Sequence, residues 1–151
     1  YKIFYKGAPN IVKKGFIFYC ELGFNIGSEQ GDKRPVVILQ NNKGNSSSTT
    51  TIVAPITTHR GMKVIGEENG KTTIKFIDNN GIEHAKKLDY YEIPVNIEPG
   101  YKREITGYIN LAQIRKISKK RLEKSHIAKI TPDTEKKIKA ALVRLLAMEE
   151  G

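Results

Sequence analysis

Arg34 is an always-charged side chain that opens one apolar run, and Thr57 is a hydroxyl side chain that ends the next. An arginine guanidinium offers a planar fork of N–H donors to phosphate oxygens and stays charged at any working pH. Arg34 stands just before the apolar run 36–39, and Thr57 ends the apolar run 52–56. Sequential strands are usually neighbours, so this cation and this hydroxyl can face one site.

Each of the two residues also has an ordinary structural explanation. Arg34 can form a surface ion pair with Glu29 or Asp32, which lie in the segment just before it. Thr57 stands among several other threonines, and a threonine at a strand end is normally strand filler or a cap. The residue types alone therefore leave both readings open.

The elements that must position these residues are short strands. Residues 15–22 and 36–39 are rich in β-branched and aromatic side chains, and residues 52–54 form the next buried strand. An exposed, glycine-containing loop over residues 23–33 separates the first two. Residues 40–51 are almost wholly polar, and their Ser/Thr-rich part 46–50 predicts a mobile connection. Pro55 predicts an edge or a bulge.

Further along the chain, turn signals predict hairpins and a last strand. Asn69-Gly70 and Asn80-Gly81 are two-residue hairpin signals, and residues 108–117 read as one strand. Ser118 is positioned to cap a short turn. Thr131 as N-cap and Pro132 at the first position predict a helix over 131–148. We expect one domain over 1–151, with an N-terminal arm (1–11) and a hairpin region (60–103). The pattern predicts a mainly β, small bent barrel.

Composition narrows the classes of function. The net charge is +10, and residues 102–144 hold 13 Lys/Arg against 4 Asp/Glu. This balance favours a polyanionic partner, although a solvated lysine-rich surface is the alternative. Cys20 is the only cysteine, which predicts core filling and a cytoplasmic location. We expect no secretory signal and no membrane span. The three histidines lack ligand spacing, so we expect no metal and no cofactor.

Three blocks in this order resemble the MazF/PemK toxins, which are sequence-specific endoribonucleases of bacterial toxin–antitoxin pairs. The blocks are VKKG (12–15), the stretch from GSEQG (27–31) through RPVVI (34–38) to IVAPIT (52–57), and INLAQIRKI (109–117). They span residues 12 to 125, whereas residues 60–103 match poorly and are longer than usual. The resemblance implies an SH3-like barrel of the CcdB/MazF/PemK type with a C-terminal helix (α+β), usually a homodimer.

The resemblance further implies catalytic roles for Arg34 and Thr57. The substrate's own 2′-hydroxyl would attack the adjacent phosphorus and leave a 2′,3′-cyclic phosphate and a 5′-hydroxyl, without metal. Arg34 would stabilise charge on the non-bridging oxygens, and Thr57 would bond the phosphate or the attacking hydroxyl. Arginine is a poor proton carrier, so the group that moves the protons stays open.

The partners implied are single-stranded mRNA, read by its unpaired bases, and an acidic antitoxin. A CcdB-like gyrase poison and an inactive nucleic-acid-binding relative are the alternatives. The chain has no Trp, whereas the gyrase-binding tip of CcdB-like toxins uses a C-terminal one. The residues expected to contact RNA are Gly27, Ser28, Glu29, Gln30, Thr58, His59 and Gln113.

Overall fold

The chain folds mainly into β-strands followed by one long helix. The computed structural model describes residues 9, 11–23 and 33–147. The strands are β1 (Phe16–Glu21), β2 (Lys33–Ile38), β3 (Thr50–Thr58), β4 (Lys63–Glu68), β5 (Lys71–Ile77), β6 (Glu83–Lys87), β7 (Glu92–Pro94), β8 (Gly107–Asn110), β9 (Arg115–Ser118) and β10 (Ala128–Lys129). The helices are α1 (Asn42–Ser47) and α2 (Pro132–Leu146), with 3₁₀ turns η2 (Leu111–Gln113) and η3 (Lys119–Arg121). None of the helices in these ranges is long and apolar enough to cross a bilayer.

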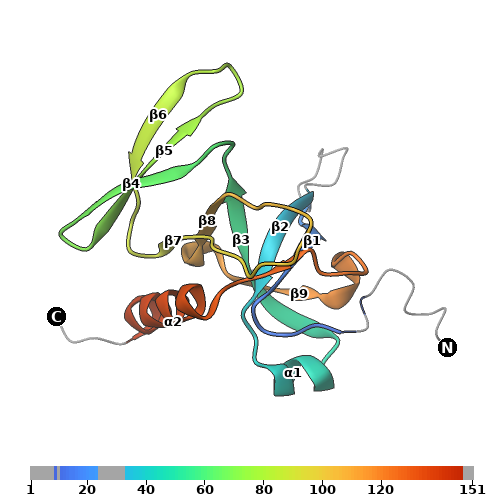
Figure 1. The fold of residues 1–151 in the computed structure, drawn as a ribbon. Coiled ribbons are helices and arrows are strands. Elements are labelled where there is room, and N and C mark those ends of the chain that lie inside the picture. The colour runs from blue at the N-terminus through green and yellow to red at the C-terminus, as the bar shows by residue number, and fades with distance from the viewer. Residues whose placement is uncertain (1–8, 10, 24–32, 148–151) are drawn as a thin grey trace.

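A strongly curled sheet forms the centre of the molecule, in the strand order β10-β1-β2-β3-β8-β7 (Figure 1). Strand β2 lies between β1 and β3, and its residues Val36, Val37 and Ile38 are fully buried. The apolar run 36–39 predicts a strand covered on both faces, and its three strand residues are so covered. The mainly β fold with a C-terminal helix is therefore confirmed.

On the side away from β2, strand β3 pairs with two strands in turn, β9 and then β8, and the sheet curls at this strand. Its first half pairs with β9 as far as Val53, and its last residues pair with β8 from Ile56 onward. Pro55 lies where the partner changes and is buried opposite Val36. The edge or bulge expected at Pro55 is thus a change of pairing inside a central strand.

Part of the polar stretch 40–51 is helical, and this helix includes residues 46 and 47 of the segment expected to be a mobile connection. Helix α1 is capped by the Asn41 side chain, which accepts from the Gly44 N–H at 2.8 Å. Asn45 is buried, donates from Nδ2 to the Gln40 carbonyl at 2.8 Å and accepts from Thr51 Oγ1 at 2.7 Å. These side-chain bonds offset the poor helix propensity of a Ser-rich segment.

The single strand expected over 108–117 is interrupted. Strand β8 ends at Asn110, whose side chain accepts from the Ala112 N–H at 3.0 Å and starts η2. The chain then turns and pairs again with β3 as β9. The sequence predicts one strand because it is rich in apolar residues throughout, and the corner follows from the side-chain cap at Asn110.

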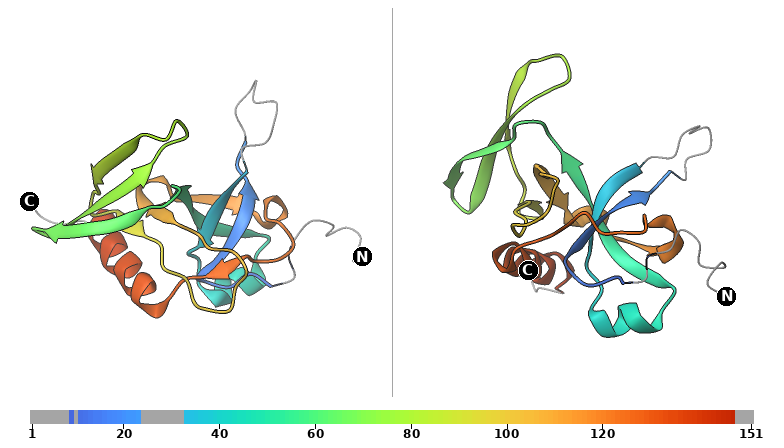
Figure 2. Two further views of the ribbon diagram at one scale, coloured as in Figure 1. Left: turned by 45° about the horizontal axis from the view of Figure 1, so that its top comes forward. Right: turned by 45° about the vertical axis from the view of Figure 1, so that its right-hand side comes forward.

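Helix α2 covers one face of the curled sheet (Figures 1 and 2). Thr131 caps it by accepting from the Thr134 N–H at 3.2 Å, and Pro132 is its first residue, as the sequence predicts. Ile138 and Ala141 are buried in the cluster that includes Ile56 and Ile109 of the sheet. This cluster fixes the helix on the face opposite to Val36 and Phe18.

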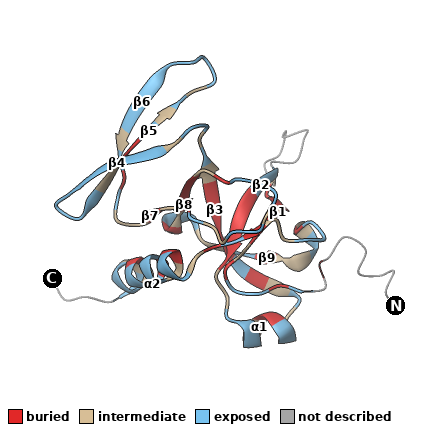
Figure 3. Ribbon diagram, viewed as in Figure 1, coloured by how far each residue is buried: buried red, intermediate tan, exposed pale blue. Residues whose placement is uncertain are grey.

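A separate three-stranded sheet, β4-β5-β6, projects from the end of β3; we call it the wing (Lys63–Lys87). The views of Figure 2 show it standing away from the central sheet. Its first hairpin turns at Asn69 and Gly70, both with positive φ (55° and 78°), and its second at Gly81 (φ 82°), as the two Asn-Gly signals predict. Most of the wing is exposed (Figure 3), whereas Ile74 is fully buried against Tyr108 and Leu88.

Candidate functional site

Arg34 and Thr57 lie at the same end of adjacent strands. Strands β2 and β3 are antiparallel, with Val36 opposite Pro55. Continuing this register by two residues sets Arg34 opposite Thr57. Residues opposite one another in an antiparallel pair project from the same face of the sheet. Arg34 is exposed and Thr57 half-buried, so the two side chains share one face at the rim of the sheet.

The same row continues across two further strands. Cys20 of β1 pairs with Arg34, and Tyr108 of β8 pairs with Thr57. Cys20 and Tyr108 are buried. We call Cys20, Arg34, Thr57 and Tyr108 the cross-strand row. Its outer members, Cys20 and Tyr108, belong to the core. Its middle members, Arg34 and Thr57, bring a cation and a hydroxyl to the surface.

Cys20 does not serve as a nucleophile in this row. Burial raises the pKa of its thiol from 9.0 to about 11, although Arg115 and Arg121 oppose the shift. A thiol with such a pKa is protonated near neutral pH, and the thiolate is the reactive form. Cys20 therefore fills the core, as the sequence predicts.

Gly107 holds Thr57 close to β8 and was missed by sequence reasoning. It lies opposite Thr58 on β3 with φ 156°, and a Cβ built on it would come within 2.1 Å of the Thr57 carbonyl oxygen. Only glycine allows this approach of the two backbones. A glycine directly before the predicted strand 108–117 is the signal that could have identified it.

His59 and Thr58 adjoin the row. Thr58 is exposed, whereas the His59 ring stacks on Phe76 at 3.7 Å between centroids and lies 5.7 Å from the Tyr108 ring. The backbone N–H of His59 donates to the Thr106 carbonyl at 3.0 Å, and Thr106 Oγ1 donates to the backbone carbonyl of His59 at 2.7 Å. Burial, followed by Lys86 and His84, lowers the pKa of His59, which favours its neutral ring.

Gln113 lies away from the row. It is the exposed last residue of η2, at the corner between β8 and β9. Since Arg115 pairs with Val53, Gln113 adjoins the middle of β3 and not the end that carries Thr57. The other residues expected to contact RNA, Gly27, Ser28, Glu29 and Gln30, lie outside the described residues. The same holds for Glu29 and Asp32, the two ion-pair partners that the sequence offers for Arg34.

Two cationic residues near the cross-strand row, Lys33 and Arg121, are held by polar contacts. Lys33, directly before Arg34, forms an ion pair with Glu123 at 2.8 Å, and Arg121 Nη1 donates to the Glu21 carbonyl at 3.2 Å. These contacts tie the rim of β1 and β2 to the segment after β9. Among the residues that the structure describes, no group of three His, Cys, Asp or Glu side chains could hold a metal ion.

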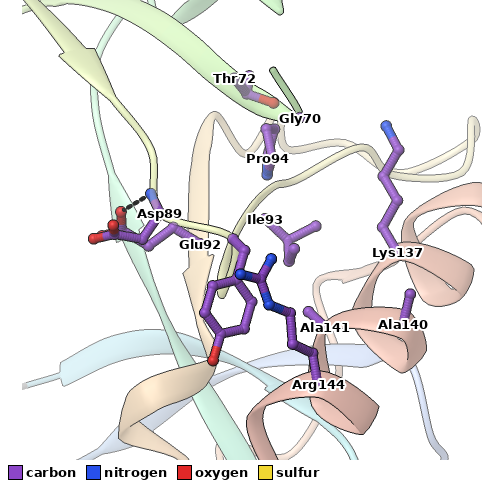
Figure 4. Close-up of a pocket in the computed structure, with 11 residues that line it drawn as sticks. Gly70, Thr72, Asp89, Glu92, Ile93, Pro94, Lys137, Ala140, Ala141 and Arg144 are labelled. Carbon is purple, nitrogen blue, oxygen red and sulfur yellow. Dashed lines mark hydrogen bonds between the residues drawn. The ribbon is translucent and has the colours of Figure 1, made fainter. Parts of the chain in front are cut away.

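A cavity of about 280 Å³ lies elsewhere, between β7, the wing and α2 (Figure 4). Arg144 stacks its guanidinium 3.9 Å from the centroid of Tyr90 at this cavity, and the Asp89 N–H donates to Glu92 Oε1 at 2.8 Å. Lys137 and Ala141 complete the α2 side. None of the cross-strand row lines it, so the cavity and the row are distinct features.

Two known proteins are similar in sequence to this chain. The chain is 33% identical over 112 residues to the endoribonuclease EndoA of Bacillus subtilis, covering 74% of this chain and 75% of that protein. It is 34% identical over 113 residues to the endoribonuclease MazF of Staphylococcus epidermidis, covering 75% and 73%. These matches extend over most of both chains.

Solved structures show the same fold. A mycobacterial endoribonuclease in complex with its cognate antitoxin superposes with a TM-score of 0.59 at 20% identity, over 93% of this chain and 100% of that chain. MazF of Deinococcus radiodurans gives 0.59 at 16% identity, over 91% and 98%. Residues 13–146 match the family described as the PemK-like, MazF-like toxin of type II toxin–antitoxin systems. The chain belongs to this toxin family.

Proposed function

We propose that this protein is a sequence-specific, ribosome-independent endonuclease of single-stranded RNA within a toxin–antitoxin pair. Membership of the toxin family and relatives named endoribonuclease support the enzyme class. The β2–β3 register, extended by two residues from Val36 and Pro55 to Arg34 and Thr57, supports the site assignment. We propose that Arg34 and Thr57 bind the phosphate of the bond that is cleaved.

The reaction uses a nucleophile that the substrate brings. The ribose 2′-hydroxyl gives up its proton and attacks the adjacent phosphorus, the bond to the 5′-oxygen of the next nucleotide breaks, and a 2′,3′-cyclic phosphate remains. The leaving oxygen takes a proton and becomes a 5′-hydroxyl. The protein must align the attack and stabilise the charge that builds on the non-bridging oxygens. A metal ion is not needed for any of these steps.

The roles of the two side chains follow from their chemistry. The Arg34 guanidinium donates two N–H groups to the phosphate and keeps its charge in the transition state. The Thr57 hydroxyl bonds the phosphate or the attacking oxygen. Thr58 and His59 lie beside the neighbouring nucleotides, and Gln113, with residues 27–30, reads bases farther from the cut.

The partners follow from charge and from the structural relatives. A net charge of +10 favours an RNA backbone and an acidic antitoxin tail that competes with it. Two structural relatives are described as complexes, one with its cognate antitoxin and one of MazE with MazF. We propose such a partner here, together with a homodimer and a cytoplasmic site of action.

The experiment is incubation of the purified protein with a long single-stranded RNA in EDTA, followed by mapping of the cut ends. We expect discrete cuts with 2′,3′-cyclic phosphate ends. Arg34→Ala should lower the cleavage rate by about 10²–10³-fold or more, because one donor to the developing charge is lost. A 2′-deoxy substitution at the cut position should block cleavage.

Lys33→Ala is the matched control, since Lys33 is the strand neighbour of Arg34, is exposed, and projects from the other face. It should cut at close to the wild-type rate. Circular dichroism and a melting curve check that both variants are folded. Cutting by Arg34→Ala at the wild-type rate would refute the assignment. RNA that is retarded but intact would indicate a binding protein. RNA that is neither cut nor retarded would make gyrase the target to test next.

A further inference from the structure

Three aromatic side chains from three different segments form a continuous stack at the base of the wing. The rings of His59 and Phe76 are 3.7 Å apart and nearly parallel (16°), and those of Phe76 and His84 are 5.3 Å apart at 24°. We call His59, Phe76 and His84 the ring stack. Phe76 is its middle member, in contact with both imidazoles.

The stack is joined to the candidate site. His59 follows Thr57 by two residues and lies 5.7 Å from the ring of Tyr108, the partner of Thr57 on β8. Phe76 packs with Ile74, Leu88 and Tyr108 in one cluster, which anchors the wing to the central sheet. The stack therefore starts at the cross-strand row and runs outward along the wing.

The outer ring is held in place and is still accessible. His84 Nε2 lies 2.7 Å from Asp78 Oδ2, and Asp78 Oδ1 accepts from the Ile82 and Asn80 N–H groups at 2.9 and 2.8 Å. The His84 side chain nevertheless stays 46% exposed. A carboxylate and a ring neighbour thus fix an imidazole whose surface is open to solvent. A planar surface that is ordered beforehand binds another ring at a low entropic cost.

Two cationic residues belong to the inner end of the ring stack, near His59 and Tyr108. Arg60 follows His59, and Lys86 of β6 lies 5.4 Å over the Tyr108 ring and 3.5 Å from Glu92. Single-stranded nucleic acids bind to surfaces that combine cations for the backbone with aromatic rings for the bases. This combination, next to Thr57, favours an RNA base as the occupant over an apolar side chain of another protein.

We propose that the wing is an RNA subsite in which an unpaired base close to the cleaved bond stacks on His84 as the next layer of the ring stack. This inference rests on the proposed function and extends it to residues beyond the family's matched blocks. Because stacking accepts any base, the wing would add affinity more than sequence selection. It assigns a use to the enlarged region between residues 60 and 103.

The test measures binding separately from cleavage. A fluorescein-labelled, unstructured 20-nucleotide RNA with 2′-deoxyribose at the mapped cut position is titrated with protein and followed by anisotropy; where no cut is found, the unmodified RNA serves. His84→Ala should weaken binding by about 5- to 100-fold, the range expected for one stacked base. His84→Tyr, which keeps a ring, should retain most of the affinity.

Ile77→Ala is the matched control. Ile77 is exposed, follows Phe76 on β5, and projects from the face of the wing opposite to Phe76 and His84. It should bind like the wild type. In addition, 2-aminopurine is placed at each of several positions around the cut. Its fluorescence should be quenched at one position by the wild type and released in His84→Ala, a signal that a merely structural role would not give.

The outcomes separate the two proposals. If His84→Ala binds and quenches like the wild type while cleavage is intact, the stacking inference is wrong and the proposed function stands. If no transcript is cut but His84→Ala still loses affinity and quenching, the nuclease proposal fails and the subsite stands. Wild-type protein that does not bind single-stranded RNA overturns both.

Discussion

At the scale of single residues, neighbours in one row differ because their surroundings differ. Cys20 and Arg34 are paired on β1 and β2, yet Arg34 is exposed and Cys20 fully buried. Burial suppresses the ionisation of the thiol, whereas the guanidinium lies at the exposed surface. The row therefore has one ionic centre, and its cysteine contributes volume to the core.

The raised pKa of Cys20 makes stability depend on pH in the alkaline range. The folded thiol keeps its proton up to about pH 11, whereas the unfolded thiol loses it above about 9.0. The unfolded state thus releases its proton first, and stability that is fully present below pH 9 is lost as the pH rises to 11. We expect the urea midpoint to fall over this window more steeply in the wild type than in Cys20→Ala.

Titration of other groups, Tyr91 and the lysines included, is common to both proteins, so the difference between the two pH profiles isolates Cys20. Parallel profiles from pH 8 to 11 would show that the buried thiol ionises as easily as an exposed one. Each midpoint is measured by circular dichroism under reducing conditions.

Arg34 and Thr57 could be proposed from sequence because adjacent strands in sequence are usually adjacent in space, and β2 and β3 follow this rule. The partners of His59 could not be proposed. Phe76 and His84 reach it only because two hairpins fold back to the end of β3. A pattern of alternating residues does not specify where a small sheet lies relative to another one.

At the scale of elements, the approach of β8 to β3 depends on Gly107. A Cβ at this position would lie 2.1 Å from the Thr57 oxygen and 2.8 Å from the Thr58 Cα. Gly107→Ala must therefore separate the strands that hold Thr57. We expect a loss of about 3 kcal/mol or more in the free energy of unfolding, measured by urea denaturation, together with slower RNA cleavage.

Gly66→Ala is the control for this substitution. Gly66 lies on β4, and a Cβ added to it would have no other atom within 4 Å. Its substitution should change stability by less than about 0.5 kcal/mol, as at an ordinary surface site. Equal stability of Gly107→Ala and the wild type would mean that β3 and β8 do not approach each other this closely.

Sequence signals predict the turns of the wing and the start of α2 because each depends on local chemistry. Asn69-Gly70 adopts positive φ at both residues, and Thr131 caps the helix with its own hydroxyl. Helix α1 was missed because its stability comes from Asn45, whose partners Gln40 and Thr51 flank the helix. The corner after Asn110 was missed for a similar reason.

At the scale of the whole molecule, charge is concentrated in the later part of the sequence. Residues 102–144 hold 13 Lys/Arg against 4 Asp/Glu, whereas residues 1–101 hold 13 against 10. A protein that neutralises about four phosphates of single-stranded RNA should lose about 50-fold in affinity between 50 and 200 mM salt. Anisotropy titrations with the 20-nucleotide RNA measure this slope.

A melting curve at each salt concentration shows that the protein stays folded throughout the series. Affinity that does not change with salt would mean that the basic residues are not used for the RNA backbone. In that case the charge would be a property of the solvated surface alone.

The split pairing of β3 has a consequence for shortened chains. Thr57 is matched with Tyr108, and the outer edge of β1 is closed by β10, near residue 129. A chain that ends before residue 107 therefore lacks both β8 and β10 and has no complete rim around Arg34. We therefore expect a chain that ends before β8 to lack RNA cleavage, because Thr57 then has no partner strand on that side.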